Sequence, residues 1–110
     1  MEKNKIETYL GFCIRSRQIV FGAEMIERKK KGVYLLVIDG GIGKNSLKTI
    51  LQAQENLGCP LYKTAEGALG EWLHRPAVKA VAITDKNLAS AMEKAADGEP
   101  NFKLYSGGNN

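Results

Sequence analysis

Residues 33–46, VYLLVIDGGIGKNS, join an apolar run to a glycine-rich loop, and this stretch decides the class of fold. Residues 33–38 are continuously apolar and include β-branched members, which predicts a strand buried on both faces. The spacing of the apolar residues from Leu47 onward predicts a helix. Strand, glycine-rich loop and helix in this order are typical of an α/β domain that holds a phosphate at the carboxyl end of the strand.

The alternation of helix and strand continues on both sides of this stretch. Apolar periodicity and capping residues predict helices at 3–15 and 22–31, a third from about Leu47 to Leu57, a fourth capped by Thr64 and ended by Pro76, and a fifth capped by Thr84 or Asp85. Short apolar runs predict strands at 18–21, 33–38, 61–63 and 80–83. This order predicts an α/β fold, a three-layer α/β/α sandwich with a mixed four-stranded sheet. We expect one domain over residues 1–97 and a loosely ordered polar tail over 98–110.

The positive charge of the chain is concentrated in one segment. Residues 12–31 contain six basic and two acidic residues, so this segment carries the whole net charge of +4. The remaining residues contain ten of each sign. A localised basic patch favours a polyanionic partner, although such a run is also consistent with a solvated helix face.

The glycine-rich loop does not match the known nucleotide-binding motifs. A P-loop requires glycine at position 38 and serine or threonine at position 45, where this chain has Ile38 and Asn45. A dinucleotide fingerprint requires glycine at position 46, which is Ser46. Loop backbone N–H groups, the helix start and Lys44 still suit a phosphate, including one of an RNA backbone.

No catalytic site, metal site or cofactor is predicted. Cys13 and Cys59 fall among apolar residues, as is typical of buried thiols in a reducing cytosol. A triad of Ser46, His74 and Asp39 can be written down, but no spacing requires it. The apolar runs are shorter than a membrane span, and the N-terminus lacks the apolar core of a secretion signal. We therefore expect a cytoplasmic monomer without a membrane partner or a small-molecule substrate.

Several short motifs, in their order and spacing, resemble the family of ribosomal proteins L7Ae, L30e and S12e, and within it the small bacterial members of the YlxQ/YbxF type. The resemblance covers about residues 5–96. It rests on Leu10-Gly11 with Arg15 to Gln18, Gly22-Ala23-Glu24, the strand ending in Asp39, Asn45-Ser46-x-Lys48, Leu57-Gly58-Cys59-Pro60-Leu61-Tyr62, Leu69-Gly70, and Val81-Ala82-Ile83-Thr84-Asp85.

This resemblance implies the same sandwich fold and RNA binding, typically to kink-turns, in which sheared G·A pairs lie beside a sharp bend. In that family the RNA contacts the start of the second helix, the loop after the strand that ends in Asp, and the loop before the last strand. With the neighbouring basic residues, the expected RNA-binding positions are Gly22, Ala23, Glu24, Arg28, Lys29, Asp39, Gly40, Gly41, Lys44, Lys48, His74, Arg75, Pro76, Ala77 and Val78.

Two positions of the second-helix motif depart from the family pattern. Ala23 stands in place of an asparagine and Glu27 in place of a lysine. The basic residues 28–31 can restore affinity through phosphate contacts, which give no sequence choice. A protein-interaction domain on the same fold therefore remains an alternative. Glu24 is also consistent with a role at the helix N-terminus, and Asp39 with shaping a turn.

Overall fold

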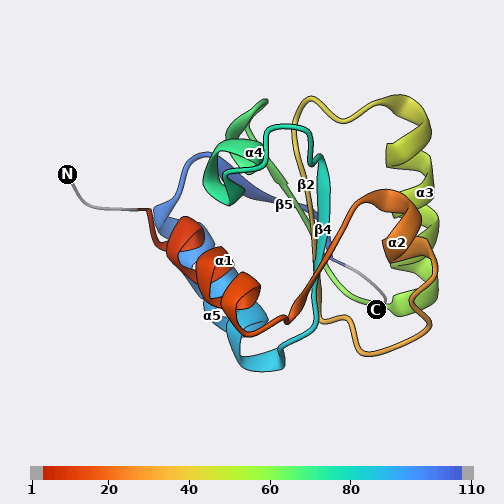
Figure 1. Cartoon of the computed structure of the whole chain (residues 1–110), viewed down its shortest axis with the longest axis horizontal. Helices are drawn as coiled ribbons and strands as arrows, with labels where there is room; N and C mark the ends of the chain where they lie inside the picture. The colour runs from red at the N-terminus through yellow and green to blue at the C-terminus, as the bar shows by residue number, and fades with distance from the viewer. Residues whose placement is uncertain (1–3, 108–110) are drawn as a thin grey trace.

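Helices and strands alternate along the chain, as the sequence predicts (Figure 1). The computed structural model describes residues 4–107. Its helices are α1 Lys5–Arg15, α2 Ala23–Glu27, α3 Lys44–Leu57, α4 Ala68–Leu73 and α5 Lys86–Ala95, followed by a 3₁₀ turn at Ala96–Gly98. Its strands are β1 Ile19–Phe21, β2 Leu35–Ile38, β3 Leu61–Thr64, β4 Ala80–Ile83 and β5 Phe102–Ser106.

The strands form one mixed sheet in the order β1-β4-β2-β3-β5. β2 and β3 are parallel, and the other neighbouring pairs are antiparallel. The prediction of four strands was wrong, because β5 adds a fifth at the edge next to β3. β5 lies within residues 98–110, where the sequence predicted a polar tail. Its anchor is Phe102, which is fully buried and stacks on Tyr62 with ring centroids 4.7 Å apart.

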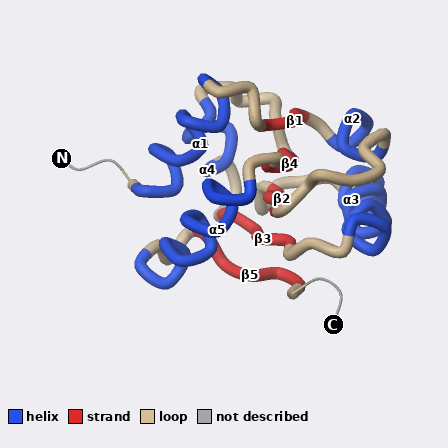
Figure 2. The backbone as a smooth tube through the Cα atoms, turned by 90° about the horizontal axis from the view of Figure 1, so that it is seen from below, coloured by secondary structure: helices blue, strands red, loops and turns tan. Residues whose placement is uncertain are grey.

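Helices cover both faces of the sheet. Figure 2 looks along the sheet and shows α1, α4 and α5 on one side and α2 and α3 on the other. The two hydrophobic clusters divide β2 by alternation: Leu35 and Val37 belong to the cluster with α1, α4 and α5, and Leu36 and Ile38 to the cluster with α2 and α3. All four residues of β2 and of β4 are buried, as their continuous apolar runs predict.

Helix α2 ends earlier than predicted. Its last helical residue is Glu27, whereas the periodicity indicated a helix to Lys31. Ile26 is its only buried residue, and the next buried side chain is Val33. A short helix depends on an apolar face packed against the core. The cations between Ile26 and Val33 offer no such face, so the chain leaves the helix before them.

The predicted helix caps at Gly58 and Asp85 are confirmed, and the predicted cap at Thr64 is wrong. Gly58 ends α3 in the left-handed conformation, with φ 71°, and the Asp85 carboxylate accepts a hydrogen bond from the N–H of Leu88 at 2.9 Å. Thr64 does not cap α4: it is the last residue of β3, and α4 follows Gly67. Within residues 4–107, no helix is long and apolar enough to cross a membrane.

Both cysteines are buried and free, as predicted. Burial raises the pKa of the Cys13 thiol to about 12 and that of the Cys59 thiol to about 11. Thiols with such pKa values stay protonated at neutral pH and are poor nucleophiles and poor metal ligands. Among residues 4–107, no group of three histidine, cysteine, aspartate or glutamate side chains is arranged to hold a metal ion.

Candidate functional site

The three segments that the sequence analysis predicts to contact RNA meet at one edge of the sheet, where β1 and β2 end and β4 begins. β4 runs antiparallel to both β1 and β2, with Phe21 opposite Val81 and Ile38 opposite Ala80. The carboxyl ends of β1 and β2 therefore lie beside the start of β4 (Figure 1). We call this end of the molecule the loop edge. It is built from residues 22–24, the loop 39–44 and the loop 74–79.

Backbone hydrogen bonds fix the three segments of the loop edge to one another. The N–H of Gly22 donates to the carbonyl of Ala80, and the N–H of Asp39 donates to the carbonyl of Lys79, each at 2.9 Å. Gly22 has φ +88°, a conformation that glycine adopts without strain, and it precedes the first helical residue of α2. The loop edge is thus held by the fold and does not depend on a ligand for its shape.

Asp39 is fully buried and ties the glycine-rich loop to the β3–α4 connection. One carboxylate oxygen accepts the N–H groups of Gly41 at 2.7 Å and Gly67 at 2.9 Å. The other oxygen accepts the N–H of Leu69 at 3.1 Å and the hydroxyl of Thr64 at 3.2 Å. Both oxygens are occupied within the protein, so Asp39 acts on a ligand only through the loop that it shapes.

The surroundings of Asp39 also keep its carboxyl ionised. Burial by itself raises the pKa of this carboxyl. The donated backbone N–H groups, with a further contribution from the Lys79 ammonium 3.8 Å away, outweigh burial and hold the pKa below its ordinary value. An ionised, fully bonded Asp39 cannot orient His74, so the triad with Ser46 has no geometric support.

Only part of the glycine-rich loop is open. A Cβ added at Gly40 would lie 2.7 Å from the carbonyl oxygen of Thr64 and 2.8 Å from the nitrogen of Glu66, so this glycine permits a close backbone approach. A Cβ at Gly43 would meet nothing within 4 Å. Gly43 caps α3 without a side-chain hydrogen bond, and the exposed Lys44 follows it. The part of the loop that is free to meet a ligand is therefore the start of α3, with exposed Lys48 one turn further along.

The third segment, His74 to Val78, folds tightly against α4. His74 ends α4 with φ 59°, and its exposed ring lies 3.4 Å from the Glu7 carboxylate. Pro76 packs against the backbone of Gly70, where an added Cβ would lie 2.9 Å from the proline Cα. Pro76 and Ala77 are exposed, and Val78 is half-buried against the core.

Arg75 joins the 74–78 loop to the end of β1. Its guanidinium lies over the Phe21 ring, 4.6 Å from the centroid, although the side chain remains exposed. This stacking was not predicted, since the two residues are far apart in the sequence and belong to different elements. It places an exposed guanidinium over Phe21, the residue that precedes Gly22 in the chain, and this guanidinium is also available to a base or a phosphate.

The cations of residues 28–31, which we call the basic segment, lie mostly beside the loop edge and not on it. Arg28 caps α2 and lies about 9 Å from Gly22 along the helix rise. The chain then crosses the flank of the molecule, and the N–H of Tyr34 donates to the carbonyl of Ile83 at the opposite end of β4. Among the described residues 4–107, basic side chains contact carboxylates at His74–Glu7 and Lys79–Asp39, so the basic segment has no carboxylate partner there.

The structure thus brings most of the predicted positions together and separates a few. Gly22, Ala23, Glu24, Gly40, Gly41, Lys44 and residues 74–78 lie at the loop edge. Ala23 is half-buried against the core, whereas Glu24 is exposed on the first turn of α2. Lys29 lies on the flank, and Asp39 lies inside the protein.

Comparison with known proteins identifies the fold and no family. No family model matches the chain, and no curated protein sequence matches it. Solved structures do match, among them a protein described as of unknown function from Bacillus halodurans, with a TM-score of 0.74 and 18% sequence identity. The match covers 86% of this chain and 99% of that one. At this identity the likeness shows a shared α/β fold only.

Proposed function

We propose that this chain is a non-catalytic RNA-binding domain with the three-layer α/β/α architecture of the L7Ae family, and that it binds structured RNA of the kink-turn or ribosomal kind. The observation that carries this proposal is the loop edge. Three segments that the family resemblance assigns to RNA contact, separate in sequence, lie side by side across the ends of β1, β2 and β4.

The groups at the loop edge suit RNA chemically. Gly22 leaves the backbone accessible at the start of α2, and the exposed Glu24 carboxylate can accept a hydrogen bond from a guanine amino group. Lys44 and Lys48 on the first turns of α3 supply positive charge for phosphates. The Arg75 guanidinium, stacked on Phe21, presents a plane on which an unstacked base can lie.

The basic segment adds attraction without sequence choice. Its cations are exposed or half-buried on the flank next to the loop edge and have no carboxylate partner among residues 4–107. Phosphate contacts of this kind position a protein on RNA and make its affinity depend on salt. We therefore infer that any preference for a bent RNA comes from the loop edge and that the basic segment contributes general affinity.

An electrophoretic shift assay with a kink-turn RNA and a straight duplex of equal length, at two salt concentrations, tests the proposal. We expect tighter binding to the kink-turn at both salt concentrations. Equal and steeply salt-dependent binding would leave phosphate attraction alone and refute kink-turn recognition. No binding to either RNA at low salt would refute the RNA proposal as a whole.

One observation favours a second candidate, a protein-interaction domain on the same fold. Ala23 and Glu27 replace the polar and basic residues of the family motif, and Met25 between them is 51% exposed. An apolar side chain in this position suits a protein partner better than RNA. Under this alternative, Met25→Glu abolishes self-association or partner capture measured by cross-linking, and RNA binding is absent.

A further inference from the structure

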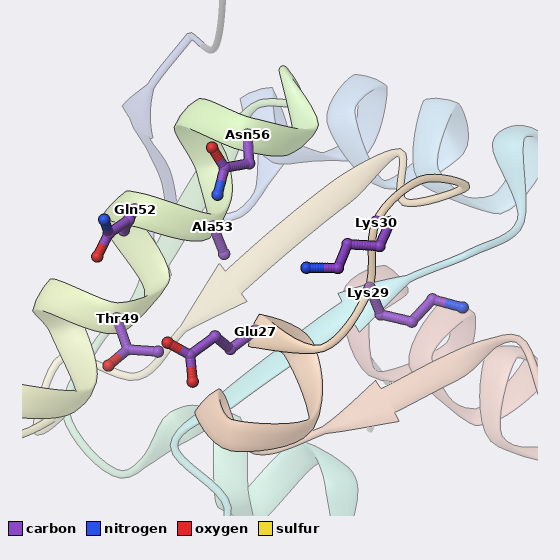
Figure 3. Close-up of a pocket in the computed structure, with 7 residues that line it drawn as sticks. All are labelled: Glu27, Lys29, Lys30, Thr49, Gln52, Ala53 and Asn56. Carbon is purple, nitrogen blue, oxygen red and sulfur yellow. The ribbon is translucent and has the colours of Figure 1, made fainter.

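A pocket of about 360 Å³ lies on the flank of the molecule, between α3 and the connection that follows α2 (Figure 3). Its position is distinct from the loop edge, since α3 contributes its middle and last turns. The residues that line it are Glu27, Lys29, Lys30, Thr49, Gln52, Ala53 and Asn56. All of these except Ala53 are polar or charged.

The α3 side of the pocket is one polar face of the helix. Positions 49, 52, 53 and 56 recur at the spacing of helical turns and so share a face. Ala53 is buried and forms the floor, while Gln52 and Asn56 are exposed. Gln54, by contrast, is buried, and its amide donates to the carbonyls of Cys59 at 3.1 Å and Ser106 at 3.2 Å. The Gln54 amide thus stabilises the fold, and the amides of Gln52 and Asn56 are left at the pocket.

The opposite wall supplies both signs of charge. Figure 3 shows Lys30 extending toward α3, with its ammonium in the space that Ala53 and Asn56 face, while Lys29 points the other way. The Glu27 carboxylate points toward Thr49 at the other end of the pocket. Neither lysine has a carboxylate partner among the described residues 4–107. The pocket therefore offers one ammonium, amide donors and acceptors, and a carboxylate acceptor within one space.

We propose that this pocket binds a single unpaired nucleotide of RNA. The side-chain amide of Asn56, with Gln52 beside it, can form paired hydrogen bonds with a base edge, because an amide carries both donors and an acceptor. Lys30 holds the adjoining phosphate, and Glu27 accepts from a base amino group or a ribose hydroxyl. The inference rests on the proposed function, to which it adds a second contact site for the strand that leaves the structured element.

The lining argues against the other ligand classes. A protein partner takes most of its binding energy from apolar and aromatic anchors, and the only apolar residue here is the small Ala53. A free anion would use the Lys30 ammonium and leave the amides and the Glu27 carboxylate without a partner. A duplex cannot enter a pocket between a helix and a loop, whereas a base splayed out of its stack can.

A nuclear magnetic resonance titration of the full chain tests the pocket directly. The probes are single-stranded ribotrinucleotides and, separately, inorganic phosphate. We expect the trinucleotides to shift the side-chain amide signals of Asn56 and Gln52 and the backbone signals of residues 27–30. Shifts confined to the loop edge would support RNA binding there and overturn the pocket. Equal shifts with phosphate alone, or none in this region, would also overturn it.

Matched variants separate this inference from the proposed function. Asn56→Leu removes the amide at the pocket, and Asn87→Leu removes an amide that is also exposed, on α5 across the sheet. We expect Asn56→Leu to raise the Kd for a single-stranded RNA about 10-fold and Asn87→Leu to leave it unchanged. Unchanged affinity in both variants, with kink-turn binding intact, would overturn the pocket and keep the loop edge.

Discussion

Asp39 in the glycine-rich loop and the basic segment carry charges that the sequence marks out as RNA contacts, yet their surroundings are opposite. Asp39 is fully buried and accepts four hydrogen bonds from the protein. The side chains of the basic segment are exposed or half-buried, and no carboxylate among residues 4–107 pairs with them. One charged position therefore organises the loop edge, and the others remain available to a partner.

This difference shows that a charged residue can belong to a motif for either of two reasons: it stabilises the fold, or it binds a partner. A buried charge costs several kcal/mol of desolvation unless the protein pairs and bonds it fully, so Asp39 is informative about the fold. An exposed lysine costs little and contributes little to stability, so the basic segment is informative about partners. The two regions should consequently respond to substitution in opposite ways, and each of the following variants tests that contrast.

The largest effect is expected from Asp39→Ala. This change leaves the backbone N–H groups of Gly41, Gly67 and Leu69 without their acceptor, whereas the Thr64 hydroxyl keeps the carbonyl of Ala65 at 2.8 Å. The expected loss is about 3–5 kcal/mol of unfolding free energy, measured by urea denaturation. Asp39→Asn should restore little, because its NH₂ group replaces an oxygen that accepts two hydrogen bonds. A loss below about 1 kcal/mol would show that the loop is not held by this carboxylate.

A smaller effect is expected from Gly40→Ala. The new methyl group would lie within 3 Å of two backbone atoms of the β3–α4 connection. Either this connection or the glycine-rich loop must therefore move. We expect a loss of about 1–3 kcal/mol in thermal or urea unfolding. Gly43→Ala is the matched control in the same loop, where space is free and φ is −74°, and it should cost less than about 1 kcal/mol. Equal losses in both variants would argue against the close approach at Gly40.

The pH dependence of stability gives a third test of the buried carboxylate. A carboxyl with a lowered pKa in the folded state stabilises fully above its unfolded pKa, near the ordinary value of 3.8, and this contribution is lost as pH falls through the folded pKa. The Tm of the native chain should therefore fall more steeply below about pH 4 than that of Asp39→Asn. Identical slopes would contradict a lowered pKa.

Glu93 provides an internal control for the pH series. Burial raises the pKa of the Glu93 carboxyl, so its contribution has the opposite sign and favours the folded state as the group becomes protonated. Glu93→Gln should accordingly make the stability loss at low pH steeper than in the native chain. A shallower loss would mean that Glu93 does not oppose Asp39.

The central part of the fold followed from local signals in the sequence. β2 and β4 are continuous apolar runs, and Gly58 and Asp85 end and begin helices where their chemistry requires. β5 was missed because Phe102 is its one buried residue, Leu104 and Tyr105 remain exposed, and Phe102 gains its partner Tyr62 only in the folded sheet. Strands that depend on one long-range contact leave little trace in the local pattern.

The candidate site was predictable in outline and not in its contacts. The resemblance assigned three separate segments to one surface, and the strand order brings them together. The sequence could not show that Asp39 turns inward, because its hydrogen-bond donors at Gly67 and Leu69 lie 28 and 30 positions away. Helical spacing alone places Gln52 and Asn56 on one polar face of α3. That this face lines a pocket depends on the basic segment opposite it, which only the structure shows.

The smallest effect on stability is expected where the effect on binding is largest. Lys29→Glu, Lys30→Glu and Lys31→Glu together should change the unfolding free energy by less than about 0.5 kcal/mol, since these side chains lie at the surface without ion-pair partners among residues 4–107. RNA affinity should fall, and the slope of log K against log salt should shrink by about 2–3 units. Reversing Lys5, Lys86 and Lys94 changes the net charge equally on the other side of the sheet and should leave the slope nearly unchanged. If the two triple variants lose RNA affinity equally, binding depends on net charge, and the contrast between an organising carboxylate and a binding segment fails.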